Sequence, residues 1–458
     1  MKYLKSSVTA FAVMFIAFSA FAGKMPKYVF LFIGDGMSTP QRLTAEEYSI
    51  HLGRGELKMN HLPKRAETVT KSANQVVTDS AAAATAIACG VKTNNGMLGL
   101  DPEKRRLESS AEVAKKSGRK VGIITTVTIN HATPAGFYAH RATRGDSRNI
   151  AMDLVNCGFD FFCGGGIGGW KKPTGGYYNT DGVFIEMKDD GSPIPEGEDP
   201  YTLWRRRGVY LRDDLAGFRA LKPGRPVWCM FGDGNFPYDL DTSADYPTPS
   251  EMVAKAIELL DGEAGFFIMC EGGHIDHAGH ANDAAANIRD ILALDAAVKT
   301  AYEFYEKHPG ETLIITTGDH ETGGLISGVA GTGRHRDLSL LDNQKCSVAA
   351  FADRLKAAKV TTAEAALPLI KRDFGLDLTE AERNRLEEIL VKHAKNPAWC
   401  VADFAKRTLA ERAGITWSHG GHSALPTLTT AVGCGAEIID GMKDNTDIGL
   451  RLKKLLAR

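Results

Sequence analysis

The stretch Tyr28-Val-Phe-Leu-Phe-Ile33, followed directly by Gly34-Asp35-Gly36, decides the fold class of this chain. A continuous apolar run of this length is typical of a strand buried on both faces, as in a parallel sheet covered by helices. The glycines on either side of Asp35 predict a tight turn where the strand ends. The segment therefore predicts a core strand that carries a carboxylate to the edge of a sheet.

Three further segments repeat the pattern of a buried strand, at residues 121–125, 266–270 and 312–316. Helical patterns lie between the strands, at residues 109–116, 250–260 and 284–306. Strands that alternate with helices predict an α/β protein, a three-layer α/β/α sandwich whose central sheet is mostly parallel. Polar side chains also follow the later strands, with Glu271 after one and Asp319 and His320 after another. Ligands of open α/β sheets bind outside the carboxyl ends of the strands, so we expect these side chains to meet there.

The first 22 residues are typical of a signal peptide. Lys2 and Lys5 precede an apolar run, and Ala20-Phe21-Ala22 supplies a cleavage site before Gly23. A membrane anchor is the alternative, but the apolar run is short for a span, and no later stretch is long and apolar enough. We expect an exported protein, periplasmic or secreted, with no membrane span in the mature chain.

Residues 23–458 are predicted to form one domain with additions at two places. Residues 164–182 are rich in glycine and predict a mobile loop, without the ending of a phosphate-binding P-loop. Residues from about 325 to 415 are mostly helical and charged, and Thr379-Glu-Ala-Glu382 predicts a capping box there. We interpret this helical stretch as an insertion that covers the site edge or shapes a dimer.

Composition and cysteine content exclude several classes of protein. The chain has 458 residues, 43% of them hydrophobic and 24% charged, and a net charge of -1, as in ordinary globular proteins. No basic stripe is present, so we expect no nucleic-acid-binding surface. The eight cysteines form no C-x-x-C pair, which argues against a cysteine zinc ribbon. Cys157 and Cys163 flank a short loop and could form a disulfide, whereas other cysteines have apolar neighbours typical of buried thiols.

Ser80 is the candidate nucleophile. Thr78-Asp79-Ser80 precedes a run of alanines with high helix propensity, so Ser80 is expected at a helix N-terminus. The free backbone N–H groups at such an end favour an anion such as phosphate. The alternative is that Asp79 or Ser80 only caps the helix. A serine hydroxyl also needs a base or a metal to activate it.

A dense group of candidate metal ligands follows the strand at residues 266–270. Asp276 and His280 are four residues apart, so one helical turn would present both to a single zinc ion. Glu271 lies just upstream, and His274 and His277 add imidazoles. An isolated histidine is usually an ordinary polar side chain, but this density favours a metal site.

Further candidate ligands come from other parts of the chain. Asp319 and His320 are adjacent at a strand end, Asp35 lies between glycines, and His419-Gly-Gly-His422 offers one more imidazole. Oxygen and nitrogen ligands without a thiolate suit Zn²⁺, and an all-oxygen subset suits Mg²⁺.

An arginine is the candidate phosphate clamp. His131-Ala-Thr133-Pro134 follows the strand at residues 121–125, and Arg144 lies shortly beyond it. A guanidinium can bind two phosphoryl oxygens at once. Arg141 and Arg148 lie nearby, so composition alone does not select among the three.

Taken together, these motifs resemble the alkaline phosphatase family. They are Gly34-Asp-Gly-Met37, Val77-Thr-Asp-Ser-Ala-Ala-Ala-Ala-Thr85, Gly90-Val-Lys-Thr-Asn-Asn-Gly96, His131-Ala-Thr-Pro134, Glu271-Gly-Gly-His-Ile-Asp276, Asp319-His-Glu-Thr-Gly323 and Gly421-His-Ser423. The resemblance runs from Tyr28 to about Ala330 and resumes at Trp417, and it does not cover the helical insertion.

The resemblance implies a metal-dependent enzyme that hydrolyses small phosphate monoesters through a phosphoserine on Ser80. It implies two zinc ions and a third ion, Mg²⁺ or Zn²⁺. The first zinc would be held by Asp276, His280 and His422. The second would be held by Asp35, Asp319, His320 and Ser80. The third ion would be held by Asp35, Thr133 and Glu271, with His131 nearby through water, and the phosphate would be bound by Ser80 and Arg144.

Two positions depart from the best-known bacterial pattern of the family. His131 stands where that pattern has an aspartate, and His277 stands where it has a lysine, as in the animal enzymes. An added imidazole favours zinc over magnesium at the third position. The choice of His422 over His419 rests on the spacing to Gly433. The resemblance also implies a homodimer.

Two other functions compete with a phosphomonoesterase. A phosphodiesterase of the same superfamily would share the metal core. A non-catalytic phosphate- or metal-binding protein would take up ligand without turnover. A sulfatase is excluded, because Ser80 is followed by alanines and not by x-Pro-x-Arg.

Overall fold

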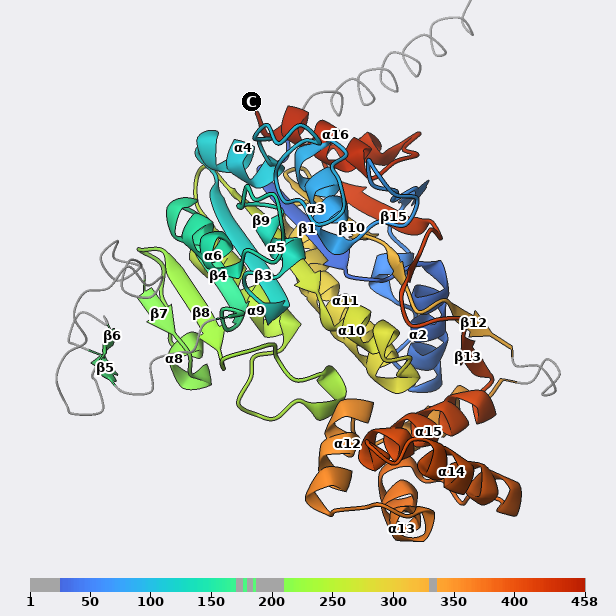
Figure 1. Cartoon of the computed structure of the whole chain (residues 1–458). Coiled ribbons are helices and arrows are strands. Elements are labelled where there is room, and N and C mark those ends of the chain that lie inside the picture. Colours follow the sequence, from blue (N-terminus) through green and yellow to red (C-terminus); the bar gives the residue numbers. More distant parts are fainter. Residues whose placement is uncertain (1–24, 170–175, 179–183, 187–209, 329–335, 458) are drawn as a thin grey trace, which may run out of the picture.

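The protein is built around a central β-sheet (Figure 1). The structure is a computed structural model that describes residues 25–169, 176–178, 184–186, 210–328 and 336–457. The predicted signal peptide lies outside the described residues. Within them the sheet has nine strands, in the order β2 (Lys64–Thr68), β15 (Thr427–Gly433), β10 (Thr312–Gly318), β1 (Tyr28–Gly34), β9 (Phe266–Gly272), β3 (Lys120–Thr128), β4 (Phe161–Gly165), β8 (Val227–Phe231) and β7 (Tyr210–Arg212). The two pairings of β15 are antiparallel and the others are parallel, so the predicted sheet type is confirmed.

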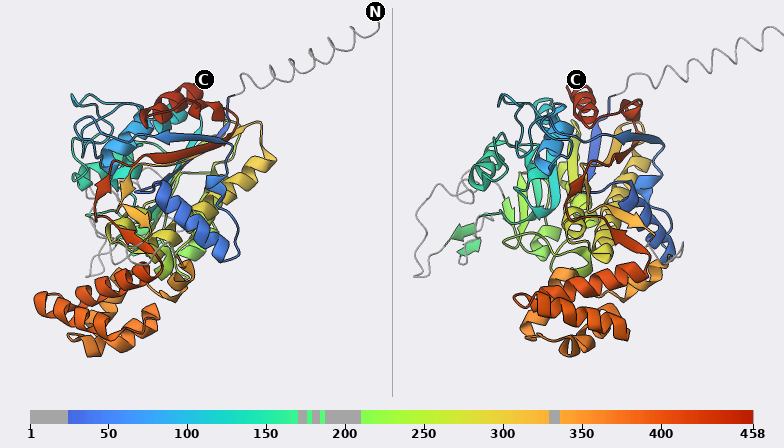
Figure 2. Two further views of the ribbon diagram at one scale, coloured as in Figure 1. Left: turned by 90° about the vertical axis from the view of Figure 1, so that its right-hand side faces the viewer. Right: turned by 45° about the vertical axis from the view of Figure 1, so that its right-hand side comes forward.

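The predicted three-layer sandwich is also confirmed, because helices cover both faces of the sheet (Figures 1 and 2). One face packs against α2 (Thr39–His51), α9 (Pro249–Leu260) and α11 (Ala284–Lys307). The other packs against α3 (Ser80–Cys89), α4 (Ser110–Lys116), α6 (Ser147–Asn156) and α16 (Thr446–Leu456). Side chains of β1 alternate between the two cores, as the period of a strand requires. Among the described helices, none combines the length and the apolar character that crossing a membrane needs.

The register of the three central strands brings their ends to one level. Gly34 at the end of β1 pairs with Gly272 of β9 and with Gly318 of β10. Parallel strands in register end at the same edge of a sheet, so the residues that follow them emerge side by side. Asp35 and Asp319 therefore leave the sheet as neighbours, and Glu271 lies one residue before the end of β9.

The predicted helical insertion begins and ends at a two-stranded ribbon. β12 (Leu325–Ser327) and β13 (Ile415–Trp417) pair antiparallel, so the chain leaves the sandwich and returns at adjacent points. Between them lie η3 (Leu338–Asn343), α12 (Val348–Ala357), α13 (Ala363–Phe374), α14 (Glu380–Lys392) and α15 (Pro397–Arg412). The capping box at Thr379 is present, with its side chain accepting from the Glu382 backbone. These helices form a group beside one end of the sandwich (Figures 1 and 2).

The predicted loop over residues 164–182 is only partly a loop. Gly164 and Gly165 belong to β4, where they pair with Met230 and Phe231 of β8. β5 (Gly176–Tyr178) pairs with β6 (Phe184–Glu186) as a separate ribbon. Residues 170–175 and 179–182 lie outside the described residues. Glycine content alone did not indicate these strands, because pairing with a neighbouring strand decided the conformation.

The disulfide that Cys157 and Cys163 could have formed is absent. All eight cysteines lie within the described residues and all are free thiols. Cys163 is fully buried in β4, whereas Cys157 follows the end of α6 and is half-buried. Burial raises the pKa of the Cys157 thiol to about 12, so the thiol stays protonated.

Candidate active site

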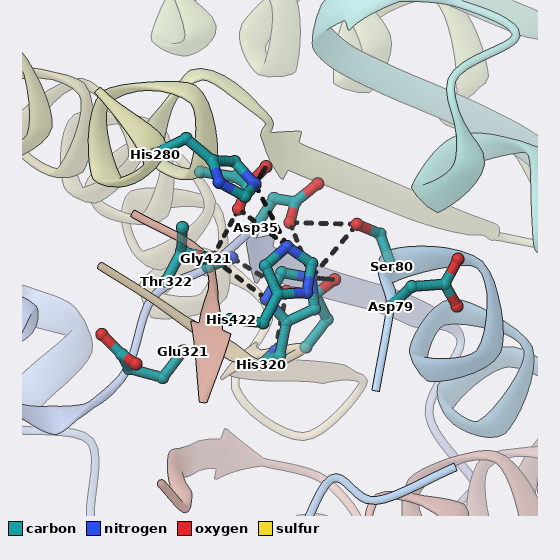
Figure 3. A network of polar contacts seen from close by, with 12 residues as sticks. Asp35, Asp79, Ser80, His280, His320, Glu321, Thr322, Gly421 and His422 are labelled. Carbon is teal, nitrogen blue, oxygen red and sulfur yellow. Dashed lines mark hydrogen bonds and ion pairs between the residues drawn. The ribbon is translucent and has the colours of Figure 1, made fainter. Parts of the chain in front are cut away.

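Four buried side chains lie at the carboxyl edge of the central strands, and Figure 3 shows two of them, Asp35 and His320. Asp35 follows β1, Glu271 belongs to the end of β9, and Asp319 and His320 follow β10. Each of the four is 0% exposed. Three carboxylates in a water-excluded space repel one another and cost free energy unless a cation or a proton compensates them.

Ser80 points into this edge from the start of α3. Asp79 caps the helix, because its side chain accepts a hydrogen bond from the Ala82 backbone at 3.0 Å. Asp79 and not Ser80 therefore caps the helix, and the Ser80 hydroxyl is available for other contacts. Ser80 Oγ lies 3.1 Å from His320 Nε2 and donates to Asp35 Oδ1 at 3.5 Å. The predicted nucleophile thus meets the predicted ligands.

Asp35, Asp319 and His320 form the inner group of candidate metal ligands. His320 Nε2 lies 3.3 Å from Asp35 Oδ1 and 3.3 Å from Asp319 Oδ2. Asp319 Oδ1 accepts hydrogen bonds from the Gly36 and His320 backbone N–H groups, at 3.0 and 2.9 Å. Its Oδ2 is buried without a hydrogen-bond partner in the protein.

Asp276, His320 and His422 form a second cluster of candidate metal ligands, and His280 lies beside it. We call Asp276, His280 and His422 the outer group. His280 Nε2 is 3.3 Å from Asp276 Oδ2 and 3.2 Å from His422 Nε2, and His422 Nε2 is 3.6 Å from Asp276 Oδ1. Asp276 and His280 belong to α10 (His274–His280), and the i, i+4 spacing brings them together as predicted. His422 comes from β14 (His422–Ser423), and its ring stacks 3.7 Å from that of His320. His320 therefore borders both groups.

His422 lies in the outer group and His419 does not. His419 Nδ1 accepts from the Gly421 backbone, so its ring turns back on its own loop. His422 Nδ1 faces the Thr78 carbonyl at 2.9 Å, which directs Nε2 toward Asp276. The spacing to Gly433 therefore selected the histidine that lies with the other ligands.

Asp35, His131 and Glu271 form the third group. His131 Nδ1 lies 3.9 Å from Asp35 Oδ2 and 3.8 Å from Glu271 Oε1. Thr133 Oγ1 donates to Asp35 Oδ2 at 3.3 Å. His131 Nδ1 and Glu271 Oε1 are both buried without a partner in the protein, although they face each other. Asp35 offers one oxygen to the inner group and the other to the third group.

Buried polar atoms are normally hydrogen-bonded, so the three exceptions in this site are informative. Asp319 Oδ2, Glu271 Oε1 and His131 Nδ1 all point at other ligand atoms of the same site. The donors are carboxylate oxygens and imidazole nitrogens without a thiolate, a set that Zn²⁺ and Mg²⁺ accept. The residues therefore fit bound divalent cations.

The pKa shifts of the inner group differ from those of the outer group. Burial raises the pKa of Asp35 and of Asp319 well above the usual range, and nearby carboxylates raise both further. Burial also lowers the pKa of His320 well below its usual value. In the outer group, the hydrogen bond to Asp276 raises the pKa of His280 to about 9. Burial opposes ionisation of Asp276, but its hydrogen bond to His280 and nearby imidazoles hold its pKa below the usual range.

Arg144 reaches the site. Its Nη1 donates to Asp79 Oδ2 at 3.3 Å, and its Nη2 lies 3.2 Å from His131 Nε2. Arg141 instead pairs with Asp153 at 2.5 Å. The guanidinium of Arg144 thus lies beside the N-terminus of α3, whose free N–H groups are available to an anion.

Two contacts of the site were not predicted. Thr322 Oγ1 donates to Asp276 Oδ1 at 2.5 Å and lies 3.3 Å from His320 Nδ1, so it links the inner and outer groups. β11 (Glu321–Thr322) pairs with β14, which sets Thr322 opposite His422. Thr322 belongs to the motif after Asp319, but no spacing rule indicates where a threonine hydroxyl will point. Glu321 faces away from the candidate metal ligands and accepts from Gln41 Nε2 at 2.9 Å.

Comparisons with known proteins are consistent with this geometry. The model of the family described as Alkaline phosphatase matches residues 26–457. Alkaline phosphatase 3 of Bacillus subtilis is 30% identical and covers 94% of this chain and 89% of its own length. The cold-active alkaline phosphatase of Shewanella sp. has a similar structure, with a TM-score of 0.78, 26% identity, and coverage of 94% of this chain and 100% of its own.

A third relative bears on the metals. It is a histidine-to-aspartate mutant of the alkaline phosphatase TAB5, whose structure has Mg bound in the M3 site. Its TM-score is 0.65 at 26% identity, and it covers 94% of this chain and 98% of its own.

Proposed function

We propose a reaction for this chain on the premise that it belongs to the alkaline phosphatase family, as the match over residues 26–457 establishes. The chain is a phosphatase that hydrolyses phosphate monoesters to an alcohol and inorganic phosphate. The observation that carries the mechanism is the position of Ser80 Oγ, at a helix N-terminus and within 3.5 Å of both Asp35 and His320.

Ser80 Oγ is the proposed nucleophile. Asp35 Oδ1 accepts the hydrogen bond of the hydroxyl and so orients the oxygen toward the phosphorus. Attack by Oγ forms a bond to phosphorus and breaks the bond between phosphorus and the ester oxygen. The hydroxyl proton of Ser80 is lost to solvent, and the leaving oxygen takes a proton from water to become the alcohol. Water then attacks the phosphoserine, which releases inorganic phosphate and restores the Ser80 hydroxyl. Arg144 and the N–H groups at the start of α3 stabilise the charge on the other phosphoryl oxygens.

The three groups would hold two zinc ions and a third ion. Asp276, His280 and His422 would hold one zinc, and Asp35, Asp319 and His320 would hold the other together with Ser80. Asp35, Thr133 and Glu271 would hold the third ion, Mg²⁺ or Zn²⁺, with His131 beside it. When bound, such cations lower the pKa of a coordinated hydroxyl and neutralise phosphoryl charge. The buried atoms of Asp319, Glu271 and His131 without partners in the protein support the assignment for the inner and third groups.

His131 bears on the identity of the third ion. Its Nδ1 faces Glu271 Oε1 at 3.8 Å, so an imidazole nitrogen is available beside two carboxylates. Imidazole favours zinc, whereas an all-oxygen set favours magnesium. The TAB5 mutant, in which an aspartate replaces a histidine, has Mg bound in its M3 site, which agrees with this preference. We propose that His131 shifts the third position toward zinc.

The direct test is the Ser80→Ala variant in acid-quenched reactions with a labelled phosphate ester. We expect the wild type to retain label on the protein and the variant to retain none, with turnover reduced about 10⁴-fold or more. Ser147→Ala is the matched control, because Asp146 and Ser147 open α6 in the same sequence pattern. Undiminished labelling of Ser80→Ala would exclude Ser80.

The substrate class has its own test. We expect turnover of nitrophenyl phosphate with a kcat/KM far above that of the matching diester. The reverse preference would indicate a phosphodiesterase, and ligand uptake without turnover would indicate a binding protein.

Export and dimerisation are proposed as well. The N-terminal pattern of residues 1–22 supports cleavage before Gly23, and the family resemblance supports a homodimer. The intact mass of protein recovered from the periplasm or medium checks the cleavage. Light scattering of the purified enzyme checks the oligomeric state.

A further inference from the structure

Three consecutive residues join α10 to α11, immediately after the candidate ligand His280. The insertion or the segment that follows it contacts each of them. Lys406 Nζ, from α15, donates to the carbonyl of Ala281. With its amide oxygen and nitrogen interchanged, which satisfies both of its contacts, Asn282 donates to the His419 carbonyl at 2.9 Å. Asn282 adopts a left-handed conformation (φ 52°), which ends α10 at this point.

The third residue of the junction is held by the start of the insertion. Asp283 caps α11 by accepting from the Ala286 backbone at 3.2 Å. The same carboxylate accepts from Gln344 Nε2 at 2.8 Å and from the Val348 backbone at 2.7 Å. The junction between α10 and α11 is therefore contacted by the first part of the insertion, by its last helix and by the segment that follows it.

Lys406 is the least ordinary of these contacts. It is 4% exposed, and burial of an ammonium costs several kcal/mol unless the charge is compensated. Asp403 Oδ1, one turn earlier in α15, lies 2.8 Å from its Nζ. The Ala281 carbonyl is the second acceptor, at the negative end of α10, where a cation is favourable. The charge of the Lys406 ammonium is thus compensated partly by the Asp403 carboxylate of α15 and partly by the carbonyl end of α10.

His280 needs such support more than the other ligands. It is the last residue of α10, and its side chain is 40% exposed, whereas that of His320 is 0% exposed. Its ring is oriented by a contact of 2.8 Å between Nδ1 and the Gly420 carbonyl, which lies just beyond β13. The position of Nε2 therefore depends on the last turn of α10 and on the segment that returns from the insertion.

We propose that the helical insertion positions the outer group, with Lys406 as the positioning residue that holds the last turn of α10. Lys406 contacts no member of the three groups, so it acts through the backbone on which His280 sits. The inference rests on the proposed function, because it assigns the outer group to a divalent cation. It gives the insertion a role in metal affinity.

The test measures Zn²⁺ binding to the full chain by competition with a chromogenic chelator. We expect Lys406→Met to weaken one zinc site about 10- to 100-fold and to leave the other sites unchanged. Lys406→Arg, which keeps a charged donor, should recover most of that affinity. Lys356→Met is the matched control, because Lys356 pairs with Asp353 in the same i, i+3 pattern at 3.2 Å but is 60% exposed. The control should bind zinc as the wild type does.

Unchanged zinc affinity in a folded Lys406→Met, even with a lower unfolding temperature, would overturn the proposal, because Lys406 would then serve stability alone. Equal weakening of all sites would overturn it too. Should Lys406→Met fail to fold, Gln344→Ala, which removes a contact of the same junction, must weaken the same single site. A wild type that binds no zinc would instead refute the proposed function, so the two failures are distinguishable.

Discussion

The inner and outer groups lie side by side but are built in different ways. Asp319 and His320 of the inner group follow a buried parallel strand, and both are 0% exposed. Asp276 and His280 of the outer group belong to a seven-residue helix, and His422 returns from beyond the insertion. The register of the sheet therefore determines the inner group, whereas peripheral contacts determine the outer one.

The two groups therefore differ in how easily their side chains can be displaced. Displacement of the inner ligands requires disruption of β1 or β10, whose residues are buried throughout. Displacement of the outer ligands requires only movement of one helical turn or of a two-residue ribbon. Second contacts such as those of Thr322 and Lys406 accordingly accumulate around the outer group. We expect the two halves to differ in activity loss, metal retention and pH response when each is perturbed.

The largest difference should appear when one ligand of each group is removed. We expect Asp319→Asn to lower kcat/KM by about 10³-fold or more, or about 4 kcal/mol, because it would weaken binding of the proposed cation beside the proposed nucleophile. His280→Asn should cost about 10- to 100-fold, since Asp276 and His422 remain. Steady-state kinetics on nitrophenyl phosphate, with metal content measured on the same samples, checks both values.

His419→Asn is the matched control for His280→Asn, because His419 lies in a neighbouring loop outside the groups and should leave kcat/KM unchanged. A larger loss from His280→Asn than from Asp319→Asn would reverse the proposed order of the two groups. It would mean that exposure of a ligand does not measure its importance here.

A smaller difference should appear in the loss of metal. We expect chelator treatment to release zinc in two phases, about 10-fold or more apart in rate, with the outer group first because His280 is partly exposed. Metal content against time, measured by mass spectrometry, resolves the phases. His280→Asn should accelerate the fast phase alone. A single phase in the wild type would contradict independent behaviour of the two groups.

Much of the inner group could be predicted from the sequence. The apolar runs before Asp35 and Asp319 predicted buried parallel strands, and parallel strands end at one edge. The position of Ser80 followed from the alanine run, because helix propensity there is not overridden by packing. The i, i+4 spacing likewise brought Asp276 and His280 together. These predictions rest on local patterns that the fold preserves.

The rest of the site could not be predicted, for physical reasons. Lys406 meets Ala281 across 125 residues, and no local pattern records which helix of an insertion packs against which turn. The Thr322 hydroxyl serves two ligands because β11 pairs with β14, a contact between short strands without a periodic signature. The roles carried over from the family remain proposals, and those of His131 and Arg144 depend on side-chain directions that spacing does not determine.

The smallest effect concerns pH and the metal-free chain. Burial and neighbouring carboxylates raise the pKa of Asp35 and Asp319, so the folded state holds protons that the unfolded state releases. Stability therefore falls as pH rises above the ordinary carboxyl pKa. His280 adds a second pH range in which stability changes, because its pKa is raised from 6.5 to about 9. The stability that protonated His280 contributes is lost as pH rises through that range. Both pH ranges lower stability as pH rises, whereas His320, whose pKa burial lowers, adds stability as pH rises through the ordinary imidazole range. Variants are needed to separate these contributions.

We predict that the unfolding temperature of the metal-free protein falls by several degrees between about pH 7 and pH 9, above the range in which His320 gains stability. Asp319→Asn should reduce this fall, because an amide has no proton to release. His280→Asn should also reduce it, but by less, since a partly exposed pair is screened by solvent. Scanning calorimetry of chelated, dialysed samples checks the curves. If metal-loaded enzyme shows the same slope as metal-free protein, cations do not compensate the buried carboxylates, and the division between the two groups loses its electrostatic basis.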